Sequence, residues 1–206
     1  ALTHGQNIVY CAPTSGGKSL VADILLARRL TQYKGCICLL VLPFVSLCVE
    51  RARDLEILLS SIHRLRVLRH FGGSGGGIPK SGTGQTYLIV CTPEKANALV
   101  TKMIEQHRLK DLKCVVVDEA HCILEHGQTF RPDFLFLALL CVLGVLTWLL
   151  LTATAPPEVM LAISHMLGID EVEPHVHRGT TARLNMSYRV VPAVTRSHKD
   201  ELLCKL

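Results

Sequence analysis

Short apolar runs recur along the chain, and most of them are followed by a turn and an amphipathic stretch. The runs rich in β-branched and other apolar residues predict strands at residues 7–11, 35–42, 65–71, 87–91, 113–117 and 147–152. The stretches with helical periodicity predict helices at residues 18–30, 44–60, 92–107 and 156–167. Strands that alternate with helices predict an α/β fold, in which a mostly parallel sheet has helices on both faces. No internal repeat or second pattern appears, so we expect one domain.

Some local signals refine this picture. Thr92 can cap the helix that follows it, with Pro93 at the first helical position. The glycine-rich stretch Gly72–Gly84 predicts a flexible surface loop. The arginines at positions 28, 29, 64, 66 and 69 are expected on solvated faces. The tail from Glu171 contains strand-like pieces without a clear core pattern.

Residues 134–157 contain no charged side chain, and a run of this length can span a bilayer. The alternative is a buried helix at 132–141, a turn near Gly144 and a buried strand at 147–152. Buried parallel strands are continuous apolar runs, and this run ends in a motif described below. We therefore favour the buried interpretation and expect no membrane partner.

The composition fits a globular protein. The chain has 206 residues, of which 49% are hydrophobic and 19% charged, so it can bury a full core. Its formal charge of +5 is compatible with a nucleic-acid partner but does not demonstrate one. The nine cysteines lie mostly in apolar runs, which favours free thiols in a reducing compartment. Cys36 and Cys38 would share one face of a strand; a zinc site there is a less favoured alternative.

A candidate phosphate-binding loop follows the first predicted strand and opens the first predicted helix. Gly16 and Gly17 let the backbone curl so that its N–H groups point at phosphate oxygens, and the helix N-terminus adds partial positive charge. Lys18 would reach the β- and γ-phosphates of ATP and is expected to face solvent without nucleotide, while Ser19 would ligate Mg²⁺. The loop consists of Ala12, Pro13, Thr14, Ser15, Gly16, Gly17, Lys18 and Ser19.

An acidic box lies 100 residues after Lys18 (118 − 18), at the end of the strand predicted for 113–117. Asp118 can hold Mg²⁺, usually through water, and Glu119 is placed to polarise the attacking water. Ligands bind at the carboxyl ends of strands in open α/β sheets. Thr152 and Thr154 close the next buried strand, and their hydroxyls can hydrogen-bond back to His121 and couple the ATP site to a groove above it.

The motifs APTSGGKS, LPFVSL, CTPEKAN, DEAH and TAT resemble, in this order, those of the first RecA-like domain of superfamily 2 helicases. The resemblance implies a RecA-like P-loop domain across residues 1–206 and a DNA helicase whose catalytic residues are Lys18, Asp118, Glu119 and His121. It also places Pro43, Ser46, Thr92 and Glu94 near the groove for single-stranded or forked DNA, as phosphate contacts or positioning residues.

The finer resemblance is mixed. NIVYCAPTSGGKSLVADILL and VLPFVSLCVE resemble the helicase domain of DNA polymerase theta and HELQ-type helicases, although these usually have DELH where this chain has DEAH. From the DEAH box onward the chain resembles RecQ helicases. Phe130 and Arg131 match the aromatic-rich DNA-sensing loop of that family, whereas His126 and Gln128 depart from it. Both families act 3′ to 5′ on DNA in repair and recombination.

The chain is expected to be a piece of a longer protein. In these families a glutamine that recognises adenine would precede Ala1, and a second RecA-like domain with an arginine finger would follow; residues 171–206 could begin the linker to it. An RNA helicase of the same superfamily and a degenerate ATP-binding fragment are the alternatives. The expected location is the nucleus in a eukaryote and otherwise the cytoplasm.

Overall fold

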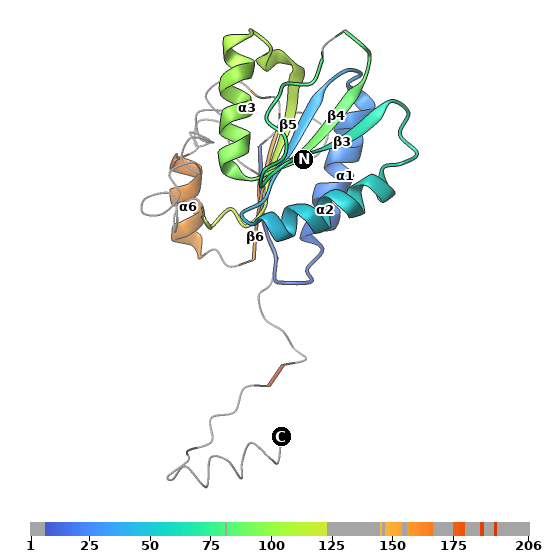
Figure 1. The fold of residues 1–206 in the computed structure, drawn as a ribbon. Coiled ribbons are helices and arrows are strands. Elements are labelled where there is room, and N and C mark those ends of the chain that lie inside the picture. The colour runs from blue at the N-terminus through green and yellow to red at the C-terminus, as the bar shows by residue number, and fades with distance from the viewer. Residues whose placement is uncertain are drawn as a thin grey trace.

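A computed structural model describes residues 7–80, 82–122, 145, 147–153, 156–166, 175–179, 186–187 and 192 of the chain. These residues form one seven-stranded sheet with helices packed on it (Figure 1). The elements are β1 (Ile8–Cys11), α1 (Lys18–Gln32), β2 (Ile37–Val41), α2 (Val45–Leu58), β3 (Leu65–His70), β4 (Thr86–Cys91), α3 (Pro93–Glu105), a 3-10 turn (Leu109–Asp111), β5 (Leu112–Val117), β6 (Trp148–Thr152), α6 (Pro157–Met166) and β7 (His175–Arg178).

The strand order is β3-β4-β2-β5-β6-β1-β7, and every neighbouring pair is parallel. The carboxyl ends of all the strands therefore lie at one edge of the sheet. In this order β6 separates β1 from β5. The loop that follows β1 and the acidic box that follows β5 thus stand on either side of the end of β6.

Among the described helices, α1 and α2 cover one face of the sheet and α3 and α6 cover the other, as Figure 1 shows. Leu25 and Leu26 of α1 and Leu55 of α2 pack with Leu40 and Val116 on one face. Leu99 and Met103 of α3 and Ile163 of α6 pack with the opposite face, which includes Leu39 and Val115. The predicted α/β class, the parallel sheet and the helices on both faces are confirmed.

The apolar segment is buried where the structure describes it. All five residues of β6 are buried, and Trp148 at its start is 1% exposed. The helix predicted at 132–141 and the turn near Gly144 lie outside the described residues. Within the described part of the chain, no helix has the length and apolar character that crossing a bilayer requires.

Thr92 is the N-cap of α3 and Pro93 stands at the first helical position, as predicted, although the Thr92 side chain makes no capping hydrogen bond. The prediction that Arg29 lies on a solvated face was wrong. Arg29 is buried, with its guanidinium donating to Gln32 Oε1 at 3.0 Å, because its position on α1 faces the sheet. The described residues of the segment 72–84 lie mostly at the surface, as predicted, where Lys102 Nζ donates to the Gly76 carbonyl at 2.8 Å and Arg108 Nη1 to that of Pro79 at 2.6 Å.

The cysteines behave as predicted. The seven in the described residues are all buried free thiols. Cys36 and Cys38 lie in the same core cluster, on the face that α1 and α2 cover. No group of three or more His, Cys, Asp or Glu side chains that could hold a metal ion occurs among the described residues, so nothing there supports a zinc site at this pair.

The central strands should dominate stability. Leu40 is 1% exposed in the middle of the sheet, so Leu40→Ala leaves a cavity and should lower the free energy of unfolding by about 2–5 kcal/mol. Leu58→Ala is the matched control, because Leu58 is 57% exposed, and its effect should stay within about 0.5 kcal/mol. Denaturant unfolding of both variants measures the difference; equal losses would contradict the placement of Leu40.

Candidate functional site

The phosphate-loop segment connects β1 to α1 in a conformation that depends on its glycines. The Gly16 N–H donates to the Pro13 carbonyl at 2.8 Å, closing a tight turn. A Cβ at Gly16 would lie 2.7 Å from that same carbonyl oxygen, so no larger residue fits without rearrangement. Gly17 is the N-cap of α1 with φ +78°, in the left-handed region that glycine adopts without strain.

The beginning of α1 is electrostatically suited to an anion. The N-cap Gly17 makes no side-chain capping bond, and no acidic residue lies in the first turn, where backbone N–H groups lack partners within the helix. Lys18 adds a cation at the end of the helix where the dipole is already positive, which is unfavourable until an anion binds. A phosphate would accept hydrogen bonds from these groups and offset both charges.

The prediction that Lys18 faces solvent was wrong. Lys18 is partly buried, and its ammonium donates to the carbonyls of Ala12 at 3.1 Å and Pro13 at 3.2 Å. These carbonyls belong to the loop itself, so the lysine is held over the place where phosphates would bind. Ser19, the predicted Mg²⁺ ligand, is exposed one residue further along the first turn.

The acidic box is held by backbone bonds to the strands on both sides of β5. The Asp118 N–H donates to the Val41 carbonyl of β2 at 3.0 Å, and the Ala120 N–H to the Leu151 carbonyl of β6 at 2.8 Å. Between them Glu119 adopts φ +50°, an uncommon conformation for a residue with a side chain. Its N–H donates to Asp118 Oδ1 at 2.9 Å, which fixes the orientation of that carboxylate.

Burial raises the pKa of the Asp118 carboxyl above its usual value of 3.8. The Glu119 N–H and the positive charge of Lys18 oppose this rise. Lys18 belongs to the phosphate loop, so a charge in one half of the site favours the ionised form of the acid in the other half. A partly desolvated carboxylate is stabilised further by a cation, which is the charge that Mg²⁺ would supply.

Thr152 joins the two halves. Its carbonyl accepts the Ala12 N–H at the start of the phosphate loop at 3.1 Å. Its hydroxyl lies 3.1 Å from Nδ1 of His121 in the acidic box, which is the contact expected from the sequence. Thr154, the other predicted coupling residue, lies outside the described residues, as do Phe130 and Arg131.

One oxygen of Glu119 makes no hydrogen bond among the described residues. Glu119 Oε2 lies 3.3 Å from His121 Nδ1, close enough for an ion pair. It is nevertheless buried without a hydrogen-bond partner among the described residues, because that nitrogen is aligned with Thr152 instead. A buried carboxylate oxygen of this kind needs a donor, and a water molecule beside a bound phosphate would provide one.

The family comparison agrees with this geometry. The model of the family described as "DEAD/DEAH box helicase" matches residues 1–162. The chain belongs to the DEAD/DEAH box helicase family.

Several relatives refine the placement of this helicase domain. It is 37% identical over 134 residues to a Drosophila melanogaster protein named "DNA polymerase theta", covering 65% of this chain and 6% of the relative. It is 36% identical over 124 residues to the human "Helicase POLQ-like", covering 60% and 11%. A Caenorhabditis briggsae "Putative ATP-dependent DNA helicase Q1" is 29% identical over 93% of this chain and 31% of the relative. The chain thus spans only a small part of each relative.

A solved structure supports the fold. The chain is similar to the Hef helicase domain of Pyrococcus furiosus with a TM-score of 0.62 and 23% identity, over 84% of this chain and 36% of that one. This domain is therefore the first RecA-like domain of a superfamily 2 helicase, with homology to DNA polymerase theta and HELQ-like helicases.

The predicted nucleic-acid residues of the helicase domain lie beyond the ends of the adjacent strands β2 and β4. Pro43 and Thr92 are buried, which suits positioning better than direct contact, while Ser46 is exposed and Glu94 is half-buried. Phe44, which the sequence reasoning missed, is 53% exposed beside them. The sequence did offer a sign of this exposure, because Phe44 directly follows the proline that ends the strand pattern and so has no obvious position in the core.

The sequence reasoning also missed an ion pair between the two helices on one face. Arg51 of α2 donates to Asp23 of α1, and both side chains are largely buried. Burial raises the pKa of Asp23, and Arg51 opposes the rise. Arg51 also favours the ionised form of Asp118. Residues 28 apart on different helices give no sequence signal of such a pair.

The charge of Asp118 should cost stability in the nucleotide-free helicase domain. Because its folded-state pKa is raised, the folded chain binds more protons than the unfolded chain from pH 3.8 up to that raised value. Stability should therefore fall as pH rises through this window. In a chelating buffer we expect Asp118→Asn to unfold at higher denaturant concentration than the unmodified domain at about pH 7, and the gain to shrink toward about pH 4. A variant that is less stable at neutral pH would contradict this.

Proposed function

We propose that this domain is the ATP-binding half of a 3′–5′ DNA helicase or translocase that acts in DNA repair or recombination. The observation that carries the proposal is the junction at Thr152, which brings the phosphate loop and the acidic box together at neighbouring strand ends. The names of the relatives favour DNA over RNA as the substrate. The seven buried free thiols of the described residues are consistent with a reducing compartment, which would be the nucleus in a eukaryote.

Each residue has a distinct role in this proposal. The backbone from Ala12 to Gly17 and the first turn of α1 would bind the phosphates, with Lys18 leaving its loop carbonyls for the β- and γ-phosphates. Ser19 and Asp118 would hold Mg²⁺, which neutralises charge on the phosphates when bound.

Glu119 would orient the attacking water through Oε2, which makes no hydrogen bond among the described residues. His121 and Thr152 would transmit the state of the nucleotide to the nucleic-acid side of the domain. The second RecA-like domain of the full-length protein would close over the site and supply an arginine. The nucleic-acid groove would be formed by Ser46, Phe44 and the positioning residues Pro43, Thr92 and Glu94.

Glu119→Gln should separate binding from hydrolysis in the full-length protein. The amide keeps the size of the side chain and leaves Asp118 intact, so ATP affinity should stay within a few-fold while turnover falls by roughly 10² or more. Lys18→Ala is the comparison, because it removes the mobile cation and should weaken ATP binding itself. Nucleotide binding and steady-state hydrolysis measured on both variants test the assignment; parallel losses of affinity would contradict the separate roles.

The isolated 206-residue domain should hydrolyse ATP poorly. In P-loop enzymes an arginine supplied across the site contributes roughly 10³ to 10⁵ in rate, and here it would come from the second RecA-like domain. The measurement compares ATP turnover of this domain and of the full-length protein, each with and without single-stranded DNA and RNA. Robust DNA-stimulated turnover by the domain alone would contradict the two-domain mechanism. Stimulation of the full-length protein by RNA only would favour an RNA helicase, and none by either would favour a degenerate fragment.

A further inference from the structure

The edge of the sheet opposite the candidate ATP site carries an unusual concentration of basic side chains. The sheet order β3-β4-β2-β5 places the loops before these four strands next to one another. Lys34 precedes β2 and Arg64 directly precedes β3, while Lys110 lies in the 3-10 turn before β5 and Lys113 is the second residue of β5. Neighbouring strands are about 4.8 Å apart, so the four loops span roughly 15 Å. We call this set, together with His63, the basic edge.

The basic edge surrounds two neighbouring hollows that share Lys34. The first, of about 460 Å³, is lined by Lys34, His63 and Arg64 and has no carboxylate in its wall. The second, of about 380 Å³, is lined by Lys34, Lys110 and Lys113 and contains one carboxylate, Asp111. Both hollows are therefore positively charged.

The positive charge is not neutralised within the described part of the chain. Asp111 is already paired with Arg108, at 3.0 Å. Lys34, Arg64, Lys110 and Lys113 take part in none of the ion pairs that the described residues form. By contrast Arg69, in β3, is paired with Glu56 through two hydrogen bonds. What distinguishes the basic edge is that several cations without an ion pair among the described residues lie close together around the two hollows.

We propose that the basic edge is a second nucleic-acid contact that takes the phosphodiester backbone of duplex DNA. The inference rests on the proposed DNA-dependent function and deepens it. Phosphates spaced along a duplex are the polyanion that matches several unpaired cations spread over such a width. The contact would hold the duplex part of a forked substrate, away from the strand held at the carboxyl edge.

The surroundings favour a duplex over a single strand. Single-strand sites combine cations with aromatic rings on which bases stack. Among Phe, Tyr and Trp side chains, Tyr33 alone lines the two hollows, and it already has the Lys113 ammonium 5.7 Å from its ring centre. What remains exposed is cationic and suited to backbone contacts without base recognition.

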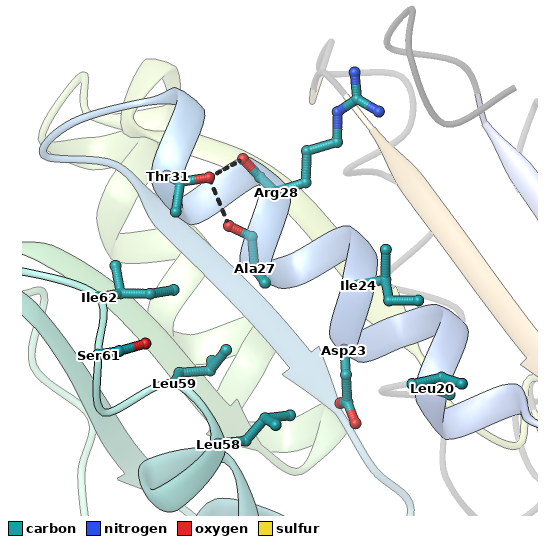
Figure 2. A pocket seen from close by; sticks show the side chains of 10 residues that line it. All are labelled: Leu20, Asp23, Ile24, Ala27, Arg28, Thr31, Leu58, Leu59, Ser61 and Ile62. Atoms are coloured by element: carbon teal, nitrogen blue, oxygen red, sulfur yellow. Dashed lines mark hydrogen bonds between the residues drawn. The ribbon is translucent and has the colours of Figure 1, made fainter.

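The basic edge has a clear boundary on the side of α1. Figure 2 shows a separate groove between α1 and the end of α2, lined mostly by apolar side chains such as Leu20, Ile24 and Leu58, together with Asp23 and Arg28. Thr31 and Ile62 line both this apolar groove and the first basic hollow, so they mark the border between them. A hydrated phosphate backbone would follow the basic side. Contact with the apolar side would remove water from the phosphates without giving them other hydrogen-bond donors.

The test is the double charge reversal Lys34→Glu/Arg64→Glu in the full-length protein. Arg28→Glu/Arg53→Glu is the matched control, because it removes the same formal charge at two exposed helix positions. Binding of a duplex with a single-stranded tail and of the single strand alone is measured over a range of salt concentrations. Each lost contact to B-DNA lowers the salt slope by about 0.9. The first variant should therefore bind the tailed duplex at least tenfold more weakly with a slope lower by about 2, and the control should change far less.

The single strand alone should bind both variants equally, and its stimulation of ATP hydrolysis should be unchanged. Unaltered affinity and slope for the tailed duplex in Lys34→Glu/Arg64→Glu would overturn the inference while leaving the proposed function standing. The inference would also be overturned if this variant lost binding only to an acidic peptide such as polyglutamate, or only to duplex RNA, and kept its affinity for duplex DNA. Failure of the unmodified protein to respond to any DNA would overturn the proposed function, and this inference with it.

Discussion

The candidate site depends on the position of β6 between β1 and β5. Parallel pairing on both sides brings the ends of these strands to one level, and Thr152 then contacts both neighbours through different atoms. Its carbonyl is used by the phosphate loop and its hydroxyl by His121, so neither half can shift without straining the other. Two segments 100 residues apart thus become one site because a third strand lies between them.

The charges of this site are arranged for a ligand rather than for the nucleotide-free fold. Lys18 stands at the positive end of α1, and Asp118 is an acid whose pKa is raised by burial. The charge of Lys18 is unfavourable at the positive end of a helix, and the charge of Asp118 is unfavourable in a buried position; the two charges compensate one another only in part. A bound phosphate would stabilise Lys18, and a divalent cation would stabilise the Asp118 carboxylate. These unfavourable charges lower the stability of the fold, and the core offsets the loss, because the strands that lead to these residues are buried on both faces of the sheet.

The sequence predicted the elements well and the contacts between them less well. Buried parallel strands and the Gly-Gly-Lys-Ser turn are local signals, which is why β1 to β6 and the phosphate loop lie where the pattern placed them. Thr152 and His121 could be paired because both close neighbouring strands. The burial of Arg29, the Arg51–Asp23 pair and the basic edge depend on strand order and helix packing. That order brings loops together from positions 34, 64, 84 and 110, which no local pattern reveals. His175–Arg178 likewise becomes a strand only through its pairing with β1.

The all-parallel sheet also separates two kinds of surface. The carboxyl edge carries the phosphate loop, the acidic box and Ser46, whereas the amino edge carries the unpaired cations. Helix α1 joins the two edges, since it begins at Lys18 and its 15 residues end two positions before Lys34. A helix of this length spans about 22 Å and is fixed to the sheet by Leu25 and Leu26. A rigid connection of this kind keeps the two edges at a constant separation. Under the proposed function, movement of DNA driven by ATP would therefore arise where this domain meets the second RecA-like domain, and the basic edge would move together with the rest of this domain.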